Sequence, residues 1–325
     1  MQKEDRIIQN ECGKIFERVK HRHWSCIEYG CKDTAINSHL LQRNGILNYV
    51  VEEGKVVMLS LKSIFGYKDS DSFIKFQKLG LKEALSHDIF CSQHDTNIFK
   101  EIEDGRIDYD NYRHCALFCY RSLCAEIRMK EMEIEKYKLM LNSDILNERV
   151  FYGKMMLLAQ QEMMMEVSKI ENEAYRTWLY DDLHNNTKSF VFKSFEIPIK
   201  GIFASAASSM FMTEKEYKSP DLMDLLFIQI IPQKENSRIM FGYHKQHVNK
   251  NYEPYIERWR NVKKEEIGFM LTGILIQLLH WGMSPSLFEK LLPKNIEKFY
   301  SLSIEDYLSP NQYPNESFNL FEGVF

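Results

Sequence analysis

The sequence of 325 residues lacks long apolar runs, a strong excess of either charge, and abundant glycine or proline. With 14 glycines and 8 prolines, it is neither collagen-like nor a low-complexity chain. Its net charge of -4 gives no general attraction to nucleic acid, so any such contact would need a local basic patch. The longest apolar run, Ile267 to Leu279, is shorter than the roughly 20 residues of a membrane span. We therefore expect a globular protein with no membrane partner.

Cysteine is also scarce, and its pattern argues against disulfides. The seven cysteines are an odd number and do not follow the spacing of a small disulfide-bonded scaffold. The first residues, Met1 to Arg6, are charged and lack the apolar core of a signal peptide. Together these features predict a protein of the reducing cytoplasm.

Four potential soft metal ligands occur as two pairs. Cys26 and Cys31 are separated by four residues, including Gly30, which suits a tight knuckle. Cys91 and His94 form a CxxH pair directly before a helix-like segment. Because thiolate and imidazole ligands select zinc over harder ions, we predict that these four residues bind one structural zinc ion. The alternative is that the cysteines are small buried hydrophobic residues.

A histidine between the two pairs is the candidate catalytic residue. Within residues 35–42, an apolar strand-like segment ends at His39, the position of the general base in HNH-type nucleases. Such an enzyme needs a base to deprotonate water and a second ion, usually Mg²⁺. His39 is alternatively a further zinc ligand or a structural histidine. The candidate companions are amides that would orient the base and acids that would hold Mg²⁺: Asn44, Asn97, Asp95 and Glu101, the last in an acidic cluster with Glu103 and Asp104.

The periodicity of apolar residues predicts the order of elements. Helical spacing is present over 1–24 and from Tyr112 to about Asp182, where Ser143 is a candidate N-cap between two long antiparallel helices. Two β-branched runs around Glu52 to Lys55 predict a hairpin. Strand-like alternation follows at 190–192, 195–199, 226–231 and 239–243, and helices return after residue 255. Gly282 suits the end of one helix, and Ser284-Pro285 the start of another.

These elements predict an α+β fold in three parts. Residues 1–110 would form a zinc-binding HNH-like treble-clef module, 111–185 a long helical hairpin, and 186–325 an α+β domain with an antiparallel sheet. Residues 111–325 would provide a surface for a protein partner or for homo-oligomerisation.

Other conspicuous residues favour structural roles. Cys115, Cys119 and Cys124 share a helical segment with apolar neighbours and are expected in the core. The methionines at 155–156 and 163–165 are expected in a core or an interface. The basic and aromatic group Arg18 to Trp24 fits either a solvated helix face or a phosphate contact with nucleic acid.

The N-terminal third resembles a group of bacterial proteins with an HNH-like treble clef that occur among genome-defence genes. The resemblance covers residues 22–105. It rests on the C-x4-C knuckle, the Ser-His-x-x-Gln stretch at 38–42, and Phe-Cys-x-x-His-Asp-x-x-x-Phe at 90–99. The chain departs from an HNH nuclease at Ser38, which replaces the usual aspartate before the histidine, and in having no histidine between His94 and His114.

Two functions from different classes follow. The first is a Mg²⁺-dependent nuclease in anti-phage defence, with His39 as its base and the zinc ion as a structural staple. The second is a non-enzymatic zinc-stapled protein that binds a partner or senses a ligand. The number of acids and amides near His39 distinguishes the two.

Overall fold

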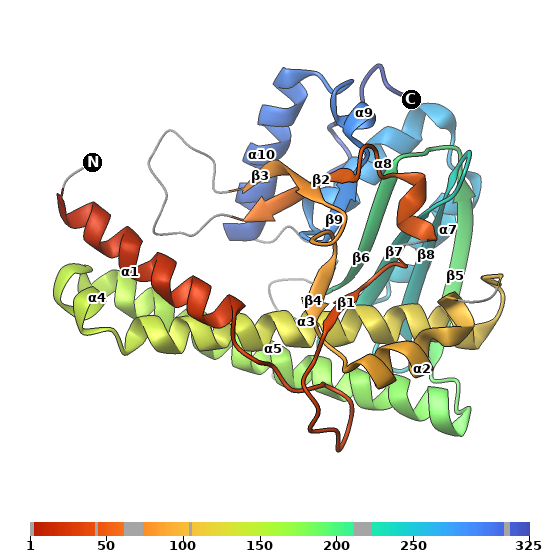
Figure 1. Cartoon of the computed structure of the whole chain (residues 1–325). Helices are drawn as coiled ribbons and strands as arrows, with labels where there is room; N and C mark the ends of the chain where they lie inside the picture. Colours follow the sequence, from red (N-terminus) through yellow and green to blue (C-terminus); the bar gives the residue numbers. More distant parts are fainter. Residues whose placement is uncertain (1–2, 43–44, 62–73, 104–105, 211–222, 309–312) are drawn as a thin grey trace.

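A computed structural model describes residues 3–42, 45–61, 74–103, 106–210, 223–308 and 313–325. These residues form a large antiparallel sheet with helices on both faces (Figure 1). The predicted mixture of helices and a large antiparallel sheet is therefore confirmed.

The helices differ greatly in length, and one short helix separates the two longest. In chain order they are α1 (Lys3–Lys20), η1 (Ile46–Tyr49), α2 (Ser92–Glu103), α3 (Tyr112–Leu141), α4 (Asp144–Arg149), α5 (Tyr152–Asn185), α7 (Tyr252–Arg258), η3 (Trp259–Asn261), α8 (Lys264–Ile276), α9 (Pro285–Phe288) and α10 (Pro293–Leu308).

Nine described strands form two sheets. They are β1 (Asn37–His39), β2 (Lys55–Leu61), β3 (Ile74–Gly80), β4 (Ser86–Asp88), β5 (Phe190–Ile197), β6 (Ile202–Ser208), β7 (Leu226–Pro232), β8 (Ser237–His244) and β9 (Trp281–Met283). Seven of them lie in the order β3-β2-β9-β6-β7-β8-β5, with every neighbouring pair antiparallel. The other two, β1 and β4, pair with each other.

Strand β7 shows why the large sheet is covered on both faces. Every residue of β7 is buried. Phe227 belongs to the core that contains α3, whereas Ile228 and Ile230 belong to the core that contains α7 and α8. The one polar residue in this apolar run, Gln229, donates a hydrogen bond to Ser122 of α3 at 2.7 Å. A strand buried on both faces has an almost continuous apolar sequence, so β7 is a strand as predicted but without the predicted alternation.

The two long helices are antiparallel, as predicted. Lys138 near the end of α3 lies 2.8 Å from Glu166 of α5, and Tyr112 at the start of α3 donates a hydrogen bond to Asp182 near the end of α5. Ser143 is an N-cap, and its hydroxyl accepts a hydrogen bond from the Leu146 amide. It caps the short α4, however, and the second long helix begins only at Tyr152.

Helices α1 and α4 and the adjoining ends of α3 and α5 extend away from the sheet (Figure 1). We call this part the helical arm. It has its own buried cluster, which includes Cys12 and Ile15 of α1, Tyr137 of α3 and Leu158 of α5. The predicted leading helix is thus confirmed, and it packs on the arm.

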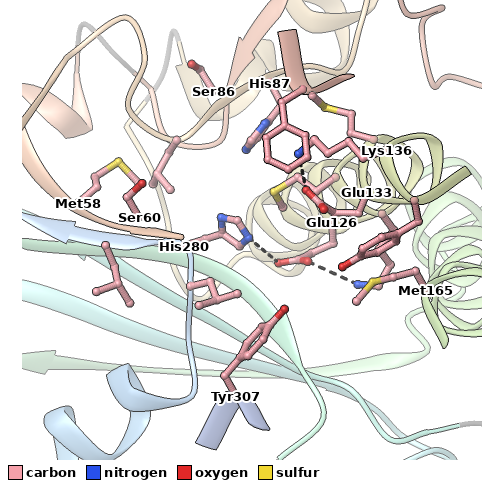
Figure 2. A pocket seen from close by; sticks show the side chains of 18 of the residues that line it. Met58, Ser60, Ser86, His87, Glu126, Glu133, Lys136, Met165, His280 and Tyr307 are labelled. Carbon is pink, nitrogen blue, oxygen red and sulfur yellow. Dashed lines mark hydrogen bonds and ion pairs between the residues drawn. The ribbon is translucent and has the colours of Figure 1, made fainter. Parts of the chain in front are cut away.

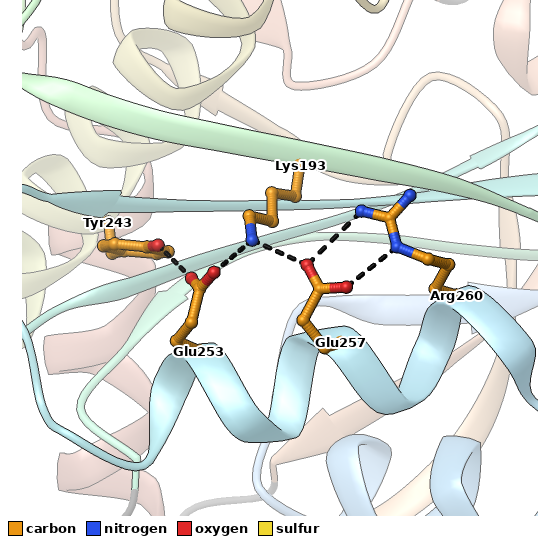
Figure 3. A network of polar contacts seen from close by, with 5 residues as sticks. All are labelled: Lys193, Tyr243, Glu253, Glu257 and Arg260. Atoms are coloured by element: carbon orange, nitrogen blue, oxygen red, sulfur yellow. Dashed lines mark hydrogen bonds and ion pairs between the residues drawn. The ribbon is translucent and has the colours of Figure 1, made fainter.

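On the other face of the sheet, a network of charged residues holds α7 against β5 and β8 (Figure 3). Lys193 of β5 pairs with Glu253 and lies 2.6 Å from Glu257. Glu253 also accepts a hydrogen bond from Tyr243 of β8, and Arg260 lies 2.8 Å from Glu257. The outer side chains of this network are exposed, so its ion pairs contribute little to the free energy of unfolding. We therefore assign the network a role in the placement of α7.

The strand β9 was not predicted, and the assignment of Gly282 to a helix end was wrong. Gly282 lies in β9, where it pairs with Met58 of β2 and Phe203 of β6. β9 therefore joins β2 and β3, from the predicted first domain, to strands of the predicted third domain. The proposed boundaries at 110 and 185 stay predictions. Ser284 caps α9 with Pro285 at its start, as expected.

The predicted hairpin around Glu52 to Lys55 is confined to one bridge. Glu52 and Lys55 exchange two backbone hydrogen bonds of 3.0 and 2.9 Å across Glu53 and Gly54, which both have positive φ. The residues before this turn form η1, and β2 instead pairs along its whole length with β3.

Within the residues that the structure describes, none of the helices combines the length and the apolar character needed to span a bilayer.

The close packing around Gly282 provides a test of the role of β9. A Cβ atom added at Gly282 would lie 2.6 Å from both the Val57 carbonyl oxygen and the Phe203 ring. We expect Gly282→Ala to lower the free energy of unfolding by about 1–3 kcal/mol, because the backbone oxygen cannot move away. Gly80→Ala is the matched control, since a Cβ there meets nothing within 4 Å. Urea denaturation measures both, and equal losses would contradict the assigned role.

Candidate metal centre

The four predicted ligands come together in space. Cys26 and Cys31 lie on the knuckle, where Gly30 has φ of +74° and the Cys31 amide donates to the Glu28 carbonyl. Cys91 immediately precedes α2, and its carbonyl accepts the amide hydrogen of Asp95 at 2.9 Å. This bond starts the helix and brings His94 onto the same side as Cys91. The ligand atoms of all four residues lie within 4.8 Å of one another.

The distances agree with tetrahedral coordination. The His94 Nδ1 atom lies 3.4 Å from Cys26 Sγ and 3.3 Å from Cys91 Sγ, and the Cys31 and Cys91 sulfur atoms are 3.9 Å apart. With Zn–S bonds of about 2.3 Å and Zn–N bonds of about 2.0 Å, a tetrahedron requires about 3.8 Å between sulfurs and about 3.5 Å between sulfur and nitrogen. The donor set and its spacing therefore fit a metal ion, and the coarser prediction of a metal-binding cluster is supported.

Burial makes the Cys26 thiol dependent on a cation. Cys26 and Cys91 are buried, and burial raises the pKa of the Cys26 thiol to about 12. A thiolate is therefore unfavourable at this position unless a positive charge compensates it. A bound divalent ion supplies that charge and keeps cysteine ligands deprotonated.

The knuckle is also attached to the long helices. Glu28 is buried and accepts a hydrogen bond from Tyr120 of α3 at 2.8 Å. Arg128 of α3 donates to the Ser25 carbonyl at 2.5 Å, and Arg176 of α5 donates to the Ile27 carbonyl at 2.9 Å. The position of the first ligand pair is thus determined by α3 and α5.

His39 does not belong to the metal cluster. It ends β1 opposite Ser86 of β4, is half-buried, and its Nε2 lies 3.2 Å from the Leu81 carbonyl oxygen. Burial raises the pKa of the Asp95 carboxyl group, and the charge of Arg121 opposes this rise. The alternative assignment of His39 as a further ligand is therefore not supported by the geometry.

The acids predicted to hold a second ion are largely engaged by arginines. Arg121, whose side chain is only 1% exposed, lies 2.6 Å from Glu103 and 3.7 Å from Asp95. Glu101 is exposed and lies 2.8 Å from Arg113. Among the described residues, the cysteine and histidine cluster is the only group of three or more ligating side chains placed to share an ion. The candidate amide Asn97 is exposed, and Asn44 and Asp104 lie outside the described residues.

Other predicted features have structural contacts. Cys115, Cys119 and Cys124 are buried, which confirms their place in the core. In the basic group Arg18 to Trp24, the Trp24 ring is buried, and the guanidinium carbons of Arg22 and Arg128 lie 4.8 and 4.9 Å from its centroid. Arg22 also pairs with Glu135 at 2.7 Å. Contact of this group with nucleic acid stays a prediction.

A pocket of about 550 Å³ was not predicted (Figure 2). It lies between the helical arm and the strands β2 and β4, and its polar end contains His87 of β4 and His280, which precedes β9. His280 lies 3.8 Å from Glu126, which lies 3.6 Å from Lys130. Much of the remaining lining is provided by methionines: Met58, Met129, Met132, Met140 and Met165.

Burial favours the uncharged forms of the two histidines in the pocket. Burial lowers the pKa of His87 to about 3, with further contributions from His280 and Lys136. Burial also lowers the pKa of His280. Neutral imidazoles can both donate and accept hydrogen bonds, so the pocket combines a polar end with an adaptable apolar wall. No local pattern connects two histidines so far apart in the sequence.

No family model matches this chain, and no curated protein or solved structure is similar to it. The resemblance to HNH-like treble-clef proteins stays a prediction from the motifs.

The pocket should accept a neutral apolar molecule with a hydrogen-bonding group, and Nile red is a suitable probe. We expect saturable binding with increased fluorescence. Met165→Trp should weaken binding on the order of tenfold or more, because the indole would occupy the volume that the dye needs. Leu292→Trp is the control, since Leu292 is 39% exposed and does not line the pocket. Equal affinity in both variants would show that the dye binds elsewhere.

Proposed function

We propose that the protein is a non-enzymatic, zinc-stapled binding protein. Cys26, Cys31, Cys91 and His94 would hold a structural zinc ion, and the pocket between the helical arm and the sheet would receive a ligand. The buried contact of Arg121 with Glu103 and Asp95 carries the choice against an enzyme.

The ligand set favours a structural zinc ion. Three thiolates and one imidazole complete a tetrahedron, which leaves no position for a catalytic water. Soft ligands of this kind select zinc over magnesium or calcium. The ion would join the knuckle to the start of α2, two segments that are distant in the sequence.

Electrostatics disfavour a second ion beside His39. The guanidinium group of Arg121 is fixed by its bond to Glu103 and by the Phe99 ring, whose centroid is 3.8 Å from the guanidinium carbon. Two unit charges about 4 Å apart interact by about 4 kcal/mol near a protein surface, and a divalent ion doubles this repulsion. Since Arg121 already provides a cation for both carboxylates, Mg²⁺ would have to compete with a buried charge that cannot leave.

The pocket supports a binding function. Its volume falls in the range of small-molecule sites. Its lining combines methionines and other apolar side chains with the two histidines and with charged residues: Glu83, Glu126, Lys130, Glu133 and Lys136. His87 belongs to β4, whose chain continues to the metal ligand Cys91. We therefore propose a ligand with an apolar body and a group that hydrogen-bonds to neutral imidazole.

A nuclease is the second candidate, and one observation favours it. The order of knuckle, β1, β4 and α2 is compatible with the predicted HNH-like treble clef, and His39 ends the first strand of the pair. A buried oxygen of Asp95 has no hydrogen-bond partner. In this function His39 would activate water, and Asp95 would help to hold Mg²⁺ in anti-phage defence.

Zinc retention tests the metal assignment. We expect about one zinc ion per purified chain, and Cys91→Ser should lose it and destabilise the N-terminal segment, because a hydroxyl is a poor zinc ligand. Cys115→Ser is the matched control, since Cys115 is buried but only donates to the Tyr109 carbonyl at 3.3 Å. Elemental analysis and circular dichroism give the readout. A wild-type protein without zinc after purification in the absence of chelators would refute the assignment.

Cleavage assays separate the two functions. The proposed binding protein should not cleave single- or double-stranded DNA or RNA with Mg²⁺, and His39→Ala should retain zinc and thermal stability. If the wild type does cleave, and His39→Ala reduces the rate on the order of a hundredfold or more without zinc loss, His39 is a general base and the nuclease is the correct function.

A further inference from the structure

The outer side of β5 is an open edge of the large sheet. β5 is the last strand in the order, and among the described strands it pairs with β8 alone (Figure 1). At the opposite edge, α10 covers part of β3, because the Tyr300 hydroxyl accepts a hydrogen bond from the Phe76 amide at 3.0 Å. Free main-chain groups along an edge are a template for a further strand.

The register of β5 shows which main-chain groups face outward. The Lys245 amide donates to the Ser189 carbonyl at 2.9 Å, so Ser189 and every second residue after it face β8. The Phe190 amide instead points away from β8 and donates to the Tyr112 hydroxyl of α3 at 3.0 Å. The residues that share the outward direction of Phe190 are Phe192, Ser194 and Glu196. Among the described residues, no group outside the sheet bonds to the main chain at these three positions.

A groove of about 310 Å³ runs around this edge. On the face of the sheet that packs on α3, the centroids of the Phe192 and Tyr112 rings are 5.0 Å apart. On the other face, the guanidinium carbon of Arg260 lies 5.2 Å from the centroid of the Phe195 ring. Because the lining comes from both faces of β5, the groove opens at the outer main chain of the strand. The remaining lining residues are Tyr109, Asp110, Cys115, Lys193 and Ser194.

One of the charges that line the groove is unpaired, and it is negative. Lys193 and Arg260 both pair with Glu257 of α7, at 2.6 and 2.8 Å (Figure 3). Asp110 is exposed, and no described residue forms an ion pair with it. The groove therefore suits a basic side chain and disfavours the phosphates of nucleic acid.

A strand is the occupant that matches the outward groups of β5. These N–H and C=O groups recur at every second residue, which is the spacing of a neighbouring strand, whereas a helix uses its main-chain groups internally. We propose that the groove binds an extended segment of a partner protein, which adds to the sheet as an antiparallel strand along residues 192–196. This site is separate from the pocket between the helical arm and the sheet.

The two faces of the groove define the side chains of the partner segment. In an antiparallel pair, the residues that bond to the outward residues of β5 lie directly opposite them, with side chains on the same face. On that face they meet Tyr109, Tyr112 and Asp110, so apolar residues and one basic residue fit there. The alternate residues point toward Lys193 and Arg260, where uncharged polar side chains fit because both cations are already paired.

A designed peptide tests this arrangement by isothermal titration calorimetry. The probe is acetyl-Thr-Val-Thr-Arg-Thr-Val-Thr-amide, whose valines and arginine would face α3. We expect saturable binding. N-methylation of both valines should weaken it on the order of tenfold or more, because their N–H groups face β5. N-methylation of the two central threonines is the matched control and should leave the affinity unchanged, since those N–H groups face away. The reverse result would overturn the antiparallel arrangement.

Substitutions in the protein locate the bound peptide. Ser194→Pro should weaken binding by a similar factor, because proline removes an outward donor yet is tolerated in an edge strand. Lys78→Pro is the control, since Lys78 has the same outward direction as Phe76 in the opposite edge strand β3. Asp110→Asn should weaken binding of the arginine peptide but not of a peptide with glutamine in place of the arginine. Zinc content and circular dichroism verify that the variants fold.

Hydrogen exchange and sedimentation velocity separate the remaining outcomes. We expect the bound peptide to slow the exchange of amide hydrogens within β5. Absence of peptide binding, equal weakening by Ser194→Pro and Lys78→Pro, or protection confined to other strands would overturn the proposal. A wild-type dimer that Ser194→Pro dissociates would also overturn it, because a second copy of the chain would then occupy the edge.

Discussion

The burial of α3 on all sides is the constraint on which the rest of the structure depends. Its N-terminal half lies between the sheet, α2 and α5, and every residue from Cys115 to Ala125 is buried. Polar side chains in such a helix each need a partner, because an unpaired buried polar group costs several kcal/mol, roughly 2–7 in transfer experiments. Ser122 contacts Ser205 of β6 at 2.6 Å, and Arg121 pairs with Glu103 of α2. These pairs determine which element lies on which side of the helix.

The candidate metal centre depends on the same helix. Tyr120 and Arg128 bind Glu28 and the Ser25 carbonyl, so α3 determines where the knuckle lies before any ion is considered. The knuckle has few apolar residues of its own, and a segment of this size does not form an independent core. The proposed ion then has one task, which is to link the knuckle to the start of α2. A closed set of four ligands performs this task without a free coordination site.

The parts of the structure that could be predicted from the sequence are specified by residues that lie close together in the chain. The two ligand pairs, the N-caps Ser143 and Ser284, and the long helical periodicity each depend on residues a few positions apart. The missed parts depend on distant residues. β9 has only three residues. In the sequence alone, its glycine fits the end of a helix, because the contacts with Val57 and Phe203 that exclude a side chain exist only in the folded chain. β6 has small residues on both faces, since Ser205 contacts Ser122 of α3 whereas Ala204 and Ala206 belong to the core of α7 and α8. It therefore lacks the alternation of large and polar residues that identifies a strand.

The choice between the two functions shows how a distant contact changes the meaning of a motif. The acids near the end of α2 suggested a site for a divalent ion when only their neighbours in the sequence were considered. Arg121, however, lies within the most apolar stretch of α3, and a buried arginine requires an anionic partner. The nearby acids Glu103 and Asp95 meet that requirement. An acidic cluster beside a helix with a buried arginine is therefore explained by the chain itself, because Arg121 contacts both carboxylates and a divalent ion would have to compete with its buried charge.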